Sequence, residues 1–245
     1  MYFRRTLRAC RQTPVCLAFC DVSILSTGFP ECVANPLSPL LSNVYLHYVL
    51  DRWFEIGCKP SFQGEATLIR FADDYVVCFQ YKEDAERFHR VLKKRMAKHG
   101  LELAEEKTRL VRFGRFAGKE AEAFDFLGFT HVCGKDRKGR FAVIRIPRRK
   151  AIRKFLDRVK QWLKAHRHWS PRSQQKYLSS MLRGFYQYFG LYHCTPKLGY
   201  VLGEVRRQWA RSLWRRSQRH RLPWDALVKK AWFQLPQPQV VHRAV

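Results

Sequence analysis

The sequence has few acidic residues. Asp and Glu number 20 against 47 Lys and Arg in 245 residues, so the formal net charge is +27. This imbalance favours a polyanionic partner, and nucleic acid is the commonest such partner. Apolar residues still make up 46% of the chain and aromatic residues 14%, which excludes a disordered basic tail and is enough to form a core.

Long apolar runs and paired cysteines are also missing. No run of 18 or more apolar residues occurs, so we expect no transmembrane helix and no membrane partner. The eight cysteines form no Cys-x-x-Cys pair, and no histidine stands at zinc-finger spacing from them. A zinc site is therefore not expected. Reduced thiols in a cytoplasmic protein are the simplest interpretation.

Positive charge is concentrated near the C-terminus. Residues 147–245 contain 23 Lys and Arg but only three Asp and Glu, a net charge of +20, whereas residues 1–146 carry +7. The change falls at Ile146-Pro147, directly before a helical pattern. We predict a domain boundary at this point.

The first part of the chain mixes helical and strand-like patterns. Ser38-Pro39 is a typical helix start, and the apolar residues that follow at helical spacing predict a helix over 38–55. Two stretches rich in β-branched and aromatic residues, 66–71 and 75–80, predict a β-hairpin. The other elements expected here are a helix at 84–99, a strand at 108–113, and a hairpin of 124–131 with 140–146. The apolar positions of the first helix are Leu40, Leu41, Val44, Tyr45, Tyr48 and Val49.

The second part of the chain is predicted to be all helix. One amphipathic pattern covers 149–166, a second begins at Ser170-Pro171 and ends at Gly190, and a third begins at Thr195-Pro196. Three such helices can form a small bundle with a basic exterior.

Asp73 and Asp74 lie at the connection of the predicted hairpin. Adjacent carboxylates repel each other, and the apolar strands on both sides give them no partner. A bound cation would offset that repulsion, and Mg²⁺ suits carboxylates because it keeps waters and binds substrate phosphate oxygens. The alternative is an ordinary polar turn, because Asp favours turns.

These residues and several other segments resemble a known family. Phe71-Ala72-Asp73-Asp74 resembles the [YF]-x-D-D box of reverse transcriptases. The chain as a whole, over about residues 28–245, resembles the reverse transcriptase/maturase encoded by bacterial group II introns. The segments that carry this resemblance are Leu37–His47, similar to S-P-L-L-A-N-x-Y-L-H; Gly100–Thr108, similar to G-L-x-L-x-x-x-K-T; Phe124–Phe129, similar to F-x-F-L-G-F; and Leu182–Gly190 in the maturase thumb.

The resemblance implies an α+β fold. A partial reverse-transcriptase palm, an antiparallel sheet with packed helices, would occupy residues 28–146, and a three-helix thumb or maturase-specific domain would occupy 147–245. It also implies an RNA-directed DNA polymerase, a nucleotidyltransferase that assists RNA splicing and intron mobility. Asp73 and Asp74 would then be catalytic and hold Mg²⁺, and Lys107 would lie near the nucleotide phosphates. The implied partners are group II intron RNA and an RNA template with a DNA primer; a homodimer is left open.

The start of the chain departs from the family pattern. Family polymerases need a third Asp on a strand well upstream of the Ser-Pro-Leu-Leu helix, and Asp21 lies only seven residues before Gly28, which is too close. The fingers region is also missing. We therefore expect residues 1–27 to be an atypical stub and the protein to be a truncated copy with little or no DNA synthesis. A non-catalytic maturase remnant that binds intron RNA is the alternative function.

The basic residues of the second part are the predicted RNA-binding site. They exceed what solubility requires and have almost no acidic neighbours, so phosphate contact is favoured over a merely solvated face. The predicted residues are Arg148, Arg149, Lys150, Arg206, Arg207, Arg211, Arg215, Arg216 and Arg219. We interpret the aromatic run of Phe185, Tyr186, Tyr188 and Phe189 as core, and Trp209 likewise. Arg70 is interpreted as balancing the charge of the acidic turn.

Overall fold

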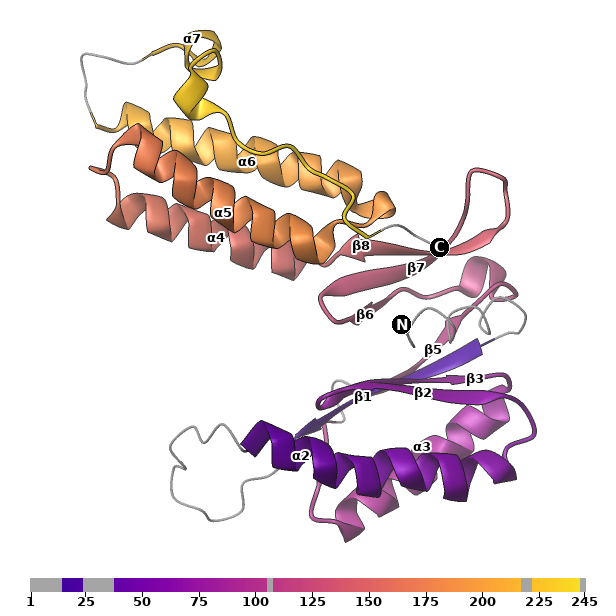
Figure 1. Ribbon diagram of the computed structural model, residues 1–245. Helices are drawn as coiled ribbons and strands as arrows, with labels where there is room; N and C mark the ends of the chain where they lie inside the picture. The colour runs from indigo at the N-terminus through magenta and orange to yellow at the C-terminus, as the bar shows by residue number, and fades with distance from the viewer. Residues whose placement is uncertain (1–14, 24–37, 105–107, 217–221, 243–245) are drawn as a thin grey trace. The chain divides into compact units, whose positions relative to one another are not determined.

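The computed structural model describes residues 38–104, 108–216 and 222–242, together with residues 15–23, which like Ser38 are described by their backbone alone (Figure 1). Internal contacts divide the chain into two units. The first extends to Leu127 and includes His131–Ile144, and the second comprises Gly128–Thr130 and the chain from Arg145 onward. The first unit combines antiparallel sheet with helices and the second is helical, which confirms the predicted α+β class.

A five-stranded sheet forms the centre of the first unit. Its path runs β2-β3-β1-β4, and β5 pairs with β1; every one of these pairings is antiparallel. The strands are β1 Val15–Ser23, β2 Ala66–Phe71, β3 Asp74–Phe79, β4 Glu102–Leu103 and β5 Arg109–Phe113. The hairpin of β2 and β3 and the strand near 108–113 confirm the sequence predictions.

The position of β1 corrects the prediction for the start of the chain. The strand lies within the segment 1–27 that we set apart as a stub, yet it pairs with β3 on one side and with β4 and β5 on the other. A central strand is buried on both faces and therefore has a nearly continuous apolar sequence. The run from Val15 to Cys20 has that composition. The run is too short for periodicity to identify it as a strand.

Two helices cover one face of the sheet (Figure 1). The first, α2, spans Ser38–Leu46 and continues as π-helical turns over His47–Arg52 and Phe54–Cys58; the second, α3, spans Lys82–Lys98. Both contribute to one core with β3, and this confirms the predicted helix packed on the hairpin's sheet. The fully buried residues of this core include Leu46, Leu50, Phe54, Tyr75, Val77, Phe79, Phe88, Leu92 and Met96.

The buried side of α2 differs from the predicted one. Leu40, Leu41, Val44, Tyr45 and Tyr48 are exposed, whereas Leu46, Val49, Leu50 and Phe54 are buried. The helix widens after Leu46, and the π-helical turns that follow contain the buried residues Val49, Leu50 and Phe54. Helical spacing predicted the helix correctly but could not predict which residues face the sheet.

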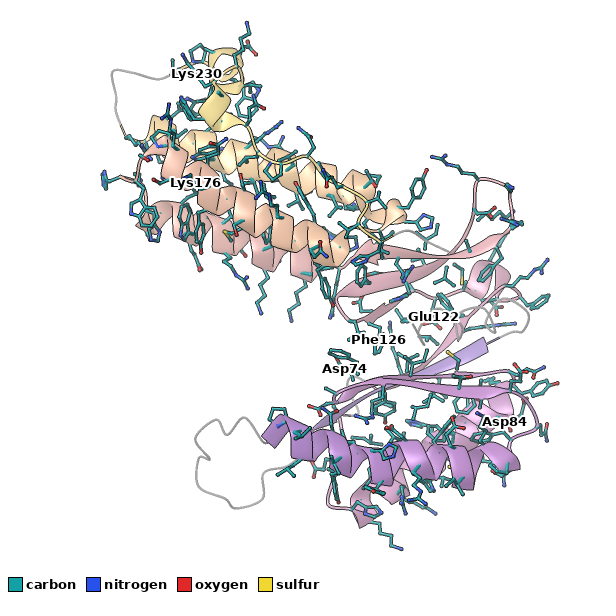
Figure 2. The ribbon with its side chains drawn as sticks, viewed as in Figure 1. Asp74, Asp84, Glu122, Phe126, Lys176 and Lys230 are labelled. Carbon is teal, nitrogen blue, oxygen red and sulfur yellow. The ribbon has the colours of Figure 1, made fainter. Side chains whose placement is uncertain are left out.

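Asp84 is the one buried acid among the described side chains of the first unit, and it stabilises the fold. Its carboxylate accepts backbone hydrogen bonds from Gln63 at 3.0 Å and from Gly64 at 3.1 Å. Figure 2 shows it at the start of α3 beside the sheet. A side chain at Gly64 would stand 2.7 Å from Gln80 and Tyr81, so the loop can approach Asp84 only with glycine there. These two hydrogen bonds explain structurally why the Asp84 carboxylate can be buried.

A second, three-stranded sheet follows, in the order β6-β7-β8. Its strands are β6 Phe124–Phe126, β7 Phe129–Lys135 and β8 Phe141–Pro147. Phe124 and Phe126 pack with Val76, Val111 and Phe113, which lie on the face of the larger sheet away from α2 and α3. The predicted hairpin is present, but its first strand is β7, which begins at Phe129 and not at Phe124; residues 124–126 form the separate strand β6.

The second unit contains the three long helices that the sequence predicts. They are α4 Arg149–Ala165, α5 Pro171–Phe189 and α6 Thr195–Trp214, followed by the short α7 Trp224–Val228. The Ser170 hydroxyl accepts a hydrogen bond from the Ser173 amide, which is the expected helix cap. Within the core, the Trp209 indole donates to the fully buried Gln174 amide oxygen at 2.8 Å. No helix in the described part of the chain is both long and apolar enough to cross a bilayer.

No disulfide joins the four cysteines whose side chains are described, which are Cys58, Cys78, Cys133 and Cys194. Burial raises the pKa of Cys58 and of Cys194 to about 11, so both stay protonated near neutral pH. The chemistry of these two thiols is that of buried structural cysteines.

Candidate functional site

The turn between β2 and β3 presents two carboxylates to solvent. Phe71 pairs with Asp74 across the hairpin, so Ala72 and Asp73 form a two-residue turn, and both Asp73 and Asp74 are exposed. This confirms the predicted position of the two acids at the hairpin tip (Figure 2). Ala72 has a φ of +53°, a conformation that glycine adopts easily and alanine only with strain.

A third acidic position joins this turn through β1. The antiparallel register of β1 and β3 sets Asp21 directly opposite Asp74. Residues directly opposite in such a pair have Cα atoms about 4.5–5.5 Å apart. Asp21 therefore does not lie too near the Ser-Pro-Leu-Leu helix to serve as a third ligand, and that part of the sequence interpretation is wrong. Distance along the chain was misleading because the sheet, not the sequence interval, sets which residues are neighbours.

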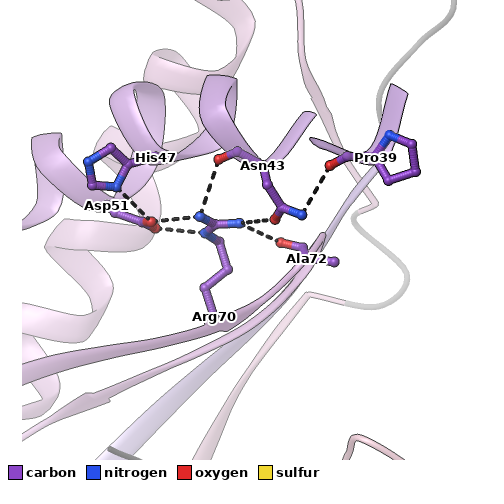
Figure 3. A network of polar contacts seen from close by, with 6 residues as sticks. All are labelled: Pro39, Asn43, His47, Asp51, Arg70 and Ala72. Atoms are coloured by element: carbon purple, nitrogen blue, oxygen red, sulfur yellow. Dashed lines mark hydrogen bonds and ion pairs between the residues drawn. The ribbon is translucent and has the colours of Figure 1, made fainter. Parts of the chain in front are cut away.

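Arg70 links the turn to the helix beside it (Figure 3). Its guanidinium binds Asp51 through two parallel hydrogen bonds, Nε to Oδ1 at 2.8 Å and Nη2 to Oδ2 at 2.7 Å. Its Nη1 donates to the Asn43 side-chain oxygen at 2.9 Å and to the Ala72 carbonyl at 3.0 Å. A bidentate arginine–carboxylate pair is both stronger and more directional than a single contact.

This arrangement gives Arg70 a different role from the one inferred from sequence. The bonds of its guanidinium go to Asp51, Asn43 and the Ala72 carbonyl, and Asp51 is the carboxylate that neutralises it. On the helix, Asn43 and Asp51 bind Arg70, and His47, midway between them, contacts Asp51 at 3.4 Å. The spacing of four residues places the three on one side of the helix. The helix thereby holds the strained turn peptide that precedes Asp73.

The described side chains supply two of the carboxylates that a metal site would need. Among them, no group of three or more His, Cys, Asp or Glu is suitable for a metal ion. Asp73 and Asp74 are the two carboxylates at the turn, and Asp21, which is described by its backbone alone, would supply the third. Oxygen ligands with open positions match the preference of Mg²⁺. Lys107, the predicted phosphate-binding residue, lies outside the described residues.

The predicted RNA-binding residues fall into three groups. Arg148, Arg149 and Lys150 are exposed at the start of α4, whose first turn contains no acidic residue. Arg207, Arg211 and Arg215 are exposed at intervals of four residues along α6, and Arg207 also pairs with Glu204. Each of these two groups therefore places three exposed cations close together along the chain or along one helix.

Two of the remaining predicted residues are not exposed like these. Arg206 and Arg216 are partly buried, and Arg216 donates to the Trp169 carbonyl at 2.7 Å. Burial lowers the pKa of Arg216. Arg219 lies outside the described residues. Arginine clusters in a sequence do not distinguish a cation that packs on its own helix bundle from one that faces outward.

The aromatic run on α5 is core at three of its four positions. Phe185, Tyr186 and Phe189 are buried, whereas Tyr188 is 53% exposed. The interpretation of Tyr188 as core is therefore wrong, because residue 188 lies at the edge of the core stripe, where its ring contacts Phe189 but remains open to solvent. Trp209 is fully buried, as expected.

Comparison with family models gives two matches in chain order. Residues 35–131 match the model of the reverse transcriptase (RNA-dependent DNA polymerase), and residues 152–232 match that of the group II intron maturase-specific domain. The chain belongs to the group II intron reverse transcriptase/maturase family. Comparison with curated proteins finds no match.

The two matched ranges agree with the two kinds of structure in this family member. The first contains α2, the acidic turn and β6, and the second contains most of α4 and all of α5, α6 and α7. Asp21 precedes the first range, so its placement in the site depends on the register of β1 alone. Reverse transcriptases generally use a divalent metal, and nucleic-acid binding follows from both domains.

The turn conformation predicts an unusual response to glycine. Ala72→Gly should raise the free energy of unfolding by up to about 1 kcal/mol, because glycine adopts positive φ without strain. Ala72→Val should lower it, since a β-branched residue is strongly disfavoured there. Urea unfolding measures both. As a control, Ala121→Gly should destabilise, because Ala121 has an ordinary φ of −64°. A valine variant as stable as the glycine variant would contradict the turn conformation.

The Arg70–Asp51 pair should show strong energetic coupling. The side chains are 13% and 26% exposed, so solvent screens them only partly. A double-mutant cycle of Arg70→Met and Asp51→Asn should give a coupling free energy of roughly 1–2 kcal/mol. The matched control is Lys59–Glu55, at 2.7 Å but 45% and 53% exposed, for which about 0.5 kcal/mol or less is expected. Equal coupling in the two pairs would mean that Arg70 is an ordinary surface contact.

Proposed function

We propose that this chain is a group II intron RNA-directed DNA polymerase and maturase. It extends a DNA primer on an RNA template, and its helical unit binds the intron RNA to assist splicing and mobility. Three acidic positions that converge from two strands, Asp21 opposite Asp74 and Asp73 beside it, are the observation that supports the polymerase activity most directly.

The acidic turn is suited to hold Mg²⁺ for nucleotide transfer. Asp73 and Asp74 are exposed at the hairpin tip, and Asp21 would supply the third carboxylate. The bound ion supplies neutralisation of charge on the reacting phosphate. The primer 3′-hydroxyl attacks the α-phosphate of the nucleotide in line, and pyrophosphate leaves. Lys107 would contribute a cation for that leaving group, as the family resemblance implies.

The chain's own residues contribute mainly orientation. Arg70 binds the carbonyl of Ala72, and Asp51 and Asn43 hold Arg70. The peptide before Asp73 is therefore fixed before any substrate arrives. A preformed position of this kind matters because catalysis of phosphoryl transfer depends mostly on positioning and charge neutralisation.

The helical unit offers a surface for RNA phosphates. Arg207, Arg211 and Arg215 form an exposed row along α6, and Arg148, Arg149 and Lys150 lie at the positive end of the α4 dipole. Like charges so placed repel one another, and phosphate binding would relieve the repulsion with release of counterions. Structured intron RNA is recognised largely by its shape and backbone, which clustered arginine and lysine suit.

A non-catalytic RNA-binding remnant is the second candidate. The absence of a third carboxylate and of the fingers region favoured it, and the register of Asp21 opposite Asp74 bears on the first of these two reasons. The family membership favours the polymerase. The two candidates differ in whether the purified chain extends a primer.

Primer extension tests the acidic site. With Mg²⁺, the wild-type chain should extend a DNA primer on RNA, and Asp73→Asn, Asp74→Asn and Asp21→Asn should each reduce the rate by roughly 10²-fold or more. The control Glu65→Gln, an exposed acid elsewhere in the first unit, should retain the rate. Full activity in Asp21→Asn would exclude Asp21 from the site.

A metal-binding measurement separates the two candidates when extension is absent. Fe²⁺ in place of Mg²⁺, with peroxide and ascorbate, should cleave the backbone near residues 21 and 73–74. Metal-directed cleavage and RNA binding without extension would favour the non-catalytic remnant. Cleavage at other positions would contradict the proposed ligands.

Charge removal tests the RNA surface. The triple variant Arg207→Gln, Arg211→Gln and Arg215→Gln should bind intron RNA more weakly, and its salt dependence should flatten by about one unit per lost contact. The helix should persist because these side chains lie away from its buried residues. The matched control is Arg90→Gln, Lys94→Gln and Lys98→Gln, three exposed cations at the same spacing on α3. Equal loss of affinity in both triple variants would show that only net charge matters.

A further inference from the structure

A groove between α4 and α5 has no role in the functions described so far. It has a volume of about 420 Å³ and is open to solvent. Its lining includes the aromatic residues Tyr177, Phe185 and Tyr188, the small residues Ser180 and Gly184, and one cation, Arg158. All of these residues belong to the second unit. The groove is within the usual size range of about 300–1,000 Å³ for sites that bind small ligands or parts of larger ones.

One wall of the groove is the end of an aromatic stack. The ring of Trp162 lies between those of His166 and Tyr177, at 4.7 Å and 4.1 Å between centroids, and each pair is nearly parallel. Trp162 covers one face of the Tyr177 ring, yet Tyr177 remains 43% exposed and lines the groove. Trp162 is the one ring stacked on Tyr177 among the described residues, so the stack has room for one more planar group.

Gly184 forms part of the groove surface in the interior of α5. A Cβ atom built there would meet nothing within 4 Å, so no packing contact requires glycine. Glycine inside a helix costs about 1 kcal/mol relative to alanine. The cost is explained if the space above residue 184 is used by a ligand that approaches the helix backbone closely.

The charge around the groove selects for an anion. Arg158 is in the lining, and no acidic residue lines the groove. α5 contains no Asp or Glu, and α4 contains only Asp157. A planar group attached to a negative charge fits both features, since aromatic stacking and a nearby guanidinium are how proteins bind single-stranded nucleic acid.

We propose that this groove binds one unpaired nucleotide of an RNA ligand, with its base stacked on Tyr177 and its phosphate at Arg158. The inference rests on the proposed RNA binding by the helical unit and specifies what kind of RNA feature that unit recognises. The Ser180 hydroxyl is placed to bond an edge of the base. Paired bases cannot enter the groove, because in a duplex their faces are covered by neighbouring base pairs.

Two RNAs that differ by one nucleotide test this. One is a hairpin whose stem carries a single bulged 5-iodouridine, and the other is the same hairpin with the stem fully paired. The full chain should bind both through phosphate contacts and should bind the bulged RNA at least about fivefold more tightly, the lower limit of stacking one base on an aromatic residue. Ultraviolet irradiation should cross-link the bulged base to α5, at or next to Tyr177.

Gly184→Leu blocks the groove without removing a contact of the fold. It should abolish the preference for the bulged RNA and leave affinity for the paired RNA unchanged, while the melting temperature does not fall because leucine favours helix. The matched control is Gly199→Leu on α6, where a Cβ would also meet nothing within 4 Å, and the preference should persist. A second pair of variants repeats this comparison. Tyr177→Leu should abolish the preference for the bulged RNA, and Tyr200→Leu, at an exposed tyrosine of α6, should keep it.

The possible failures are distinguishable. Binding of both RNAs with equal affinity, or an unchanged preference in Gly184→Leu, overturns the groove inference while RNA binding by the helical unit stands. A cross-link outside α4 and α5 also overturns it. If the wild-type chain binds neither RNA, the proposed RNA-binding function fails and the groove inference fails with it.

Discussion

The paired hydrogen bonds between Arg70 and Asp51 connect the parts of the first unit that matter for chemistry. They join a strand of the central sheet to the helix packed on it, at distances of 2.7–2.8 Å. The same guanidinium reaches the Ala72 carbonyl, so a residue with unfavourable positive φ is held in place by contacts outside the turn. Strained backbone persists where surrounding structure over-determines it, and such positions cluster at functional sites. The acidic turn is therefore a supported feature of the sheet rather than an ordinary surface loop.

The two units use their charges differently. In the first unit, charged side chains make specific contacts with defined partners. Arg70 binds Asp51, and Asp84 accepts hydrogen bonds from the Gln63 and Gly64 amides. In the helical unit, cations greatly outnumber acids, and their rows on α4 and α6 face outward. Pairing fixes geometry, which metal-dependent chemistry needs, whereas exposed cations in excess over acids attract phosphates, which RNA binding needs. Polymerisation and RNA binding thus call for the two kinds of surface that this chain carries.

Much of this could be predicted from sequence. Helix starts at Ser-Pro and Thr-Pro, the apolar periodicity of α3 to α6 and the hairpin around Asp73 depend on residues close together in the chain. Local patterns contain that information because hydrogen bonding and capping in these elements are local. The predictions that were wrong concern features that depend on residues far apart in the chain. The buried side of α2, the exposure of Tyr188 and the packing of Arg216 on Trp169 each depend on what lies on a neighbouring element.

The sequence by itself determined the α+β class, the basic helical half and the pair of adjacent carboxylates, because composition and short-range spacing specify these directly. Only the tertiary structure decided that β1 is a central strand and that Asp21 stands opposite Asp74, since strand register is set by pairing across more than 50 residues of intervening chain. It also decided which cations face solvent and that a stack ending at Tyr177 borders an open groove. Neighbours across a sheet or between helices are chosen by burial of apolar surface over the whole unit, and no local pattern encodes that choice.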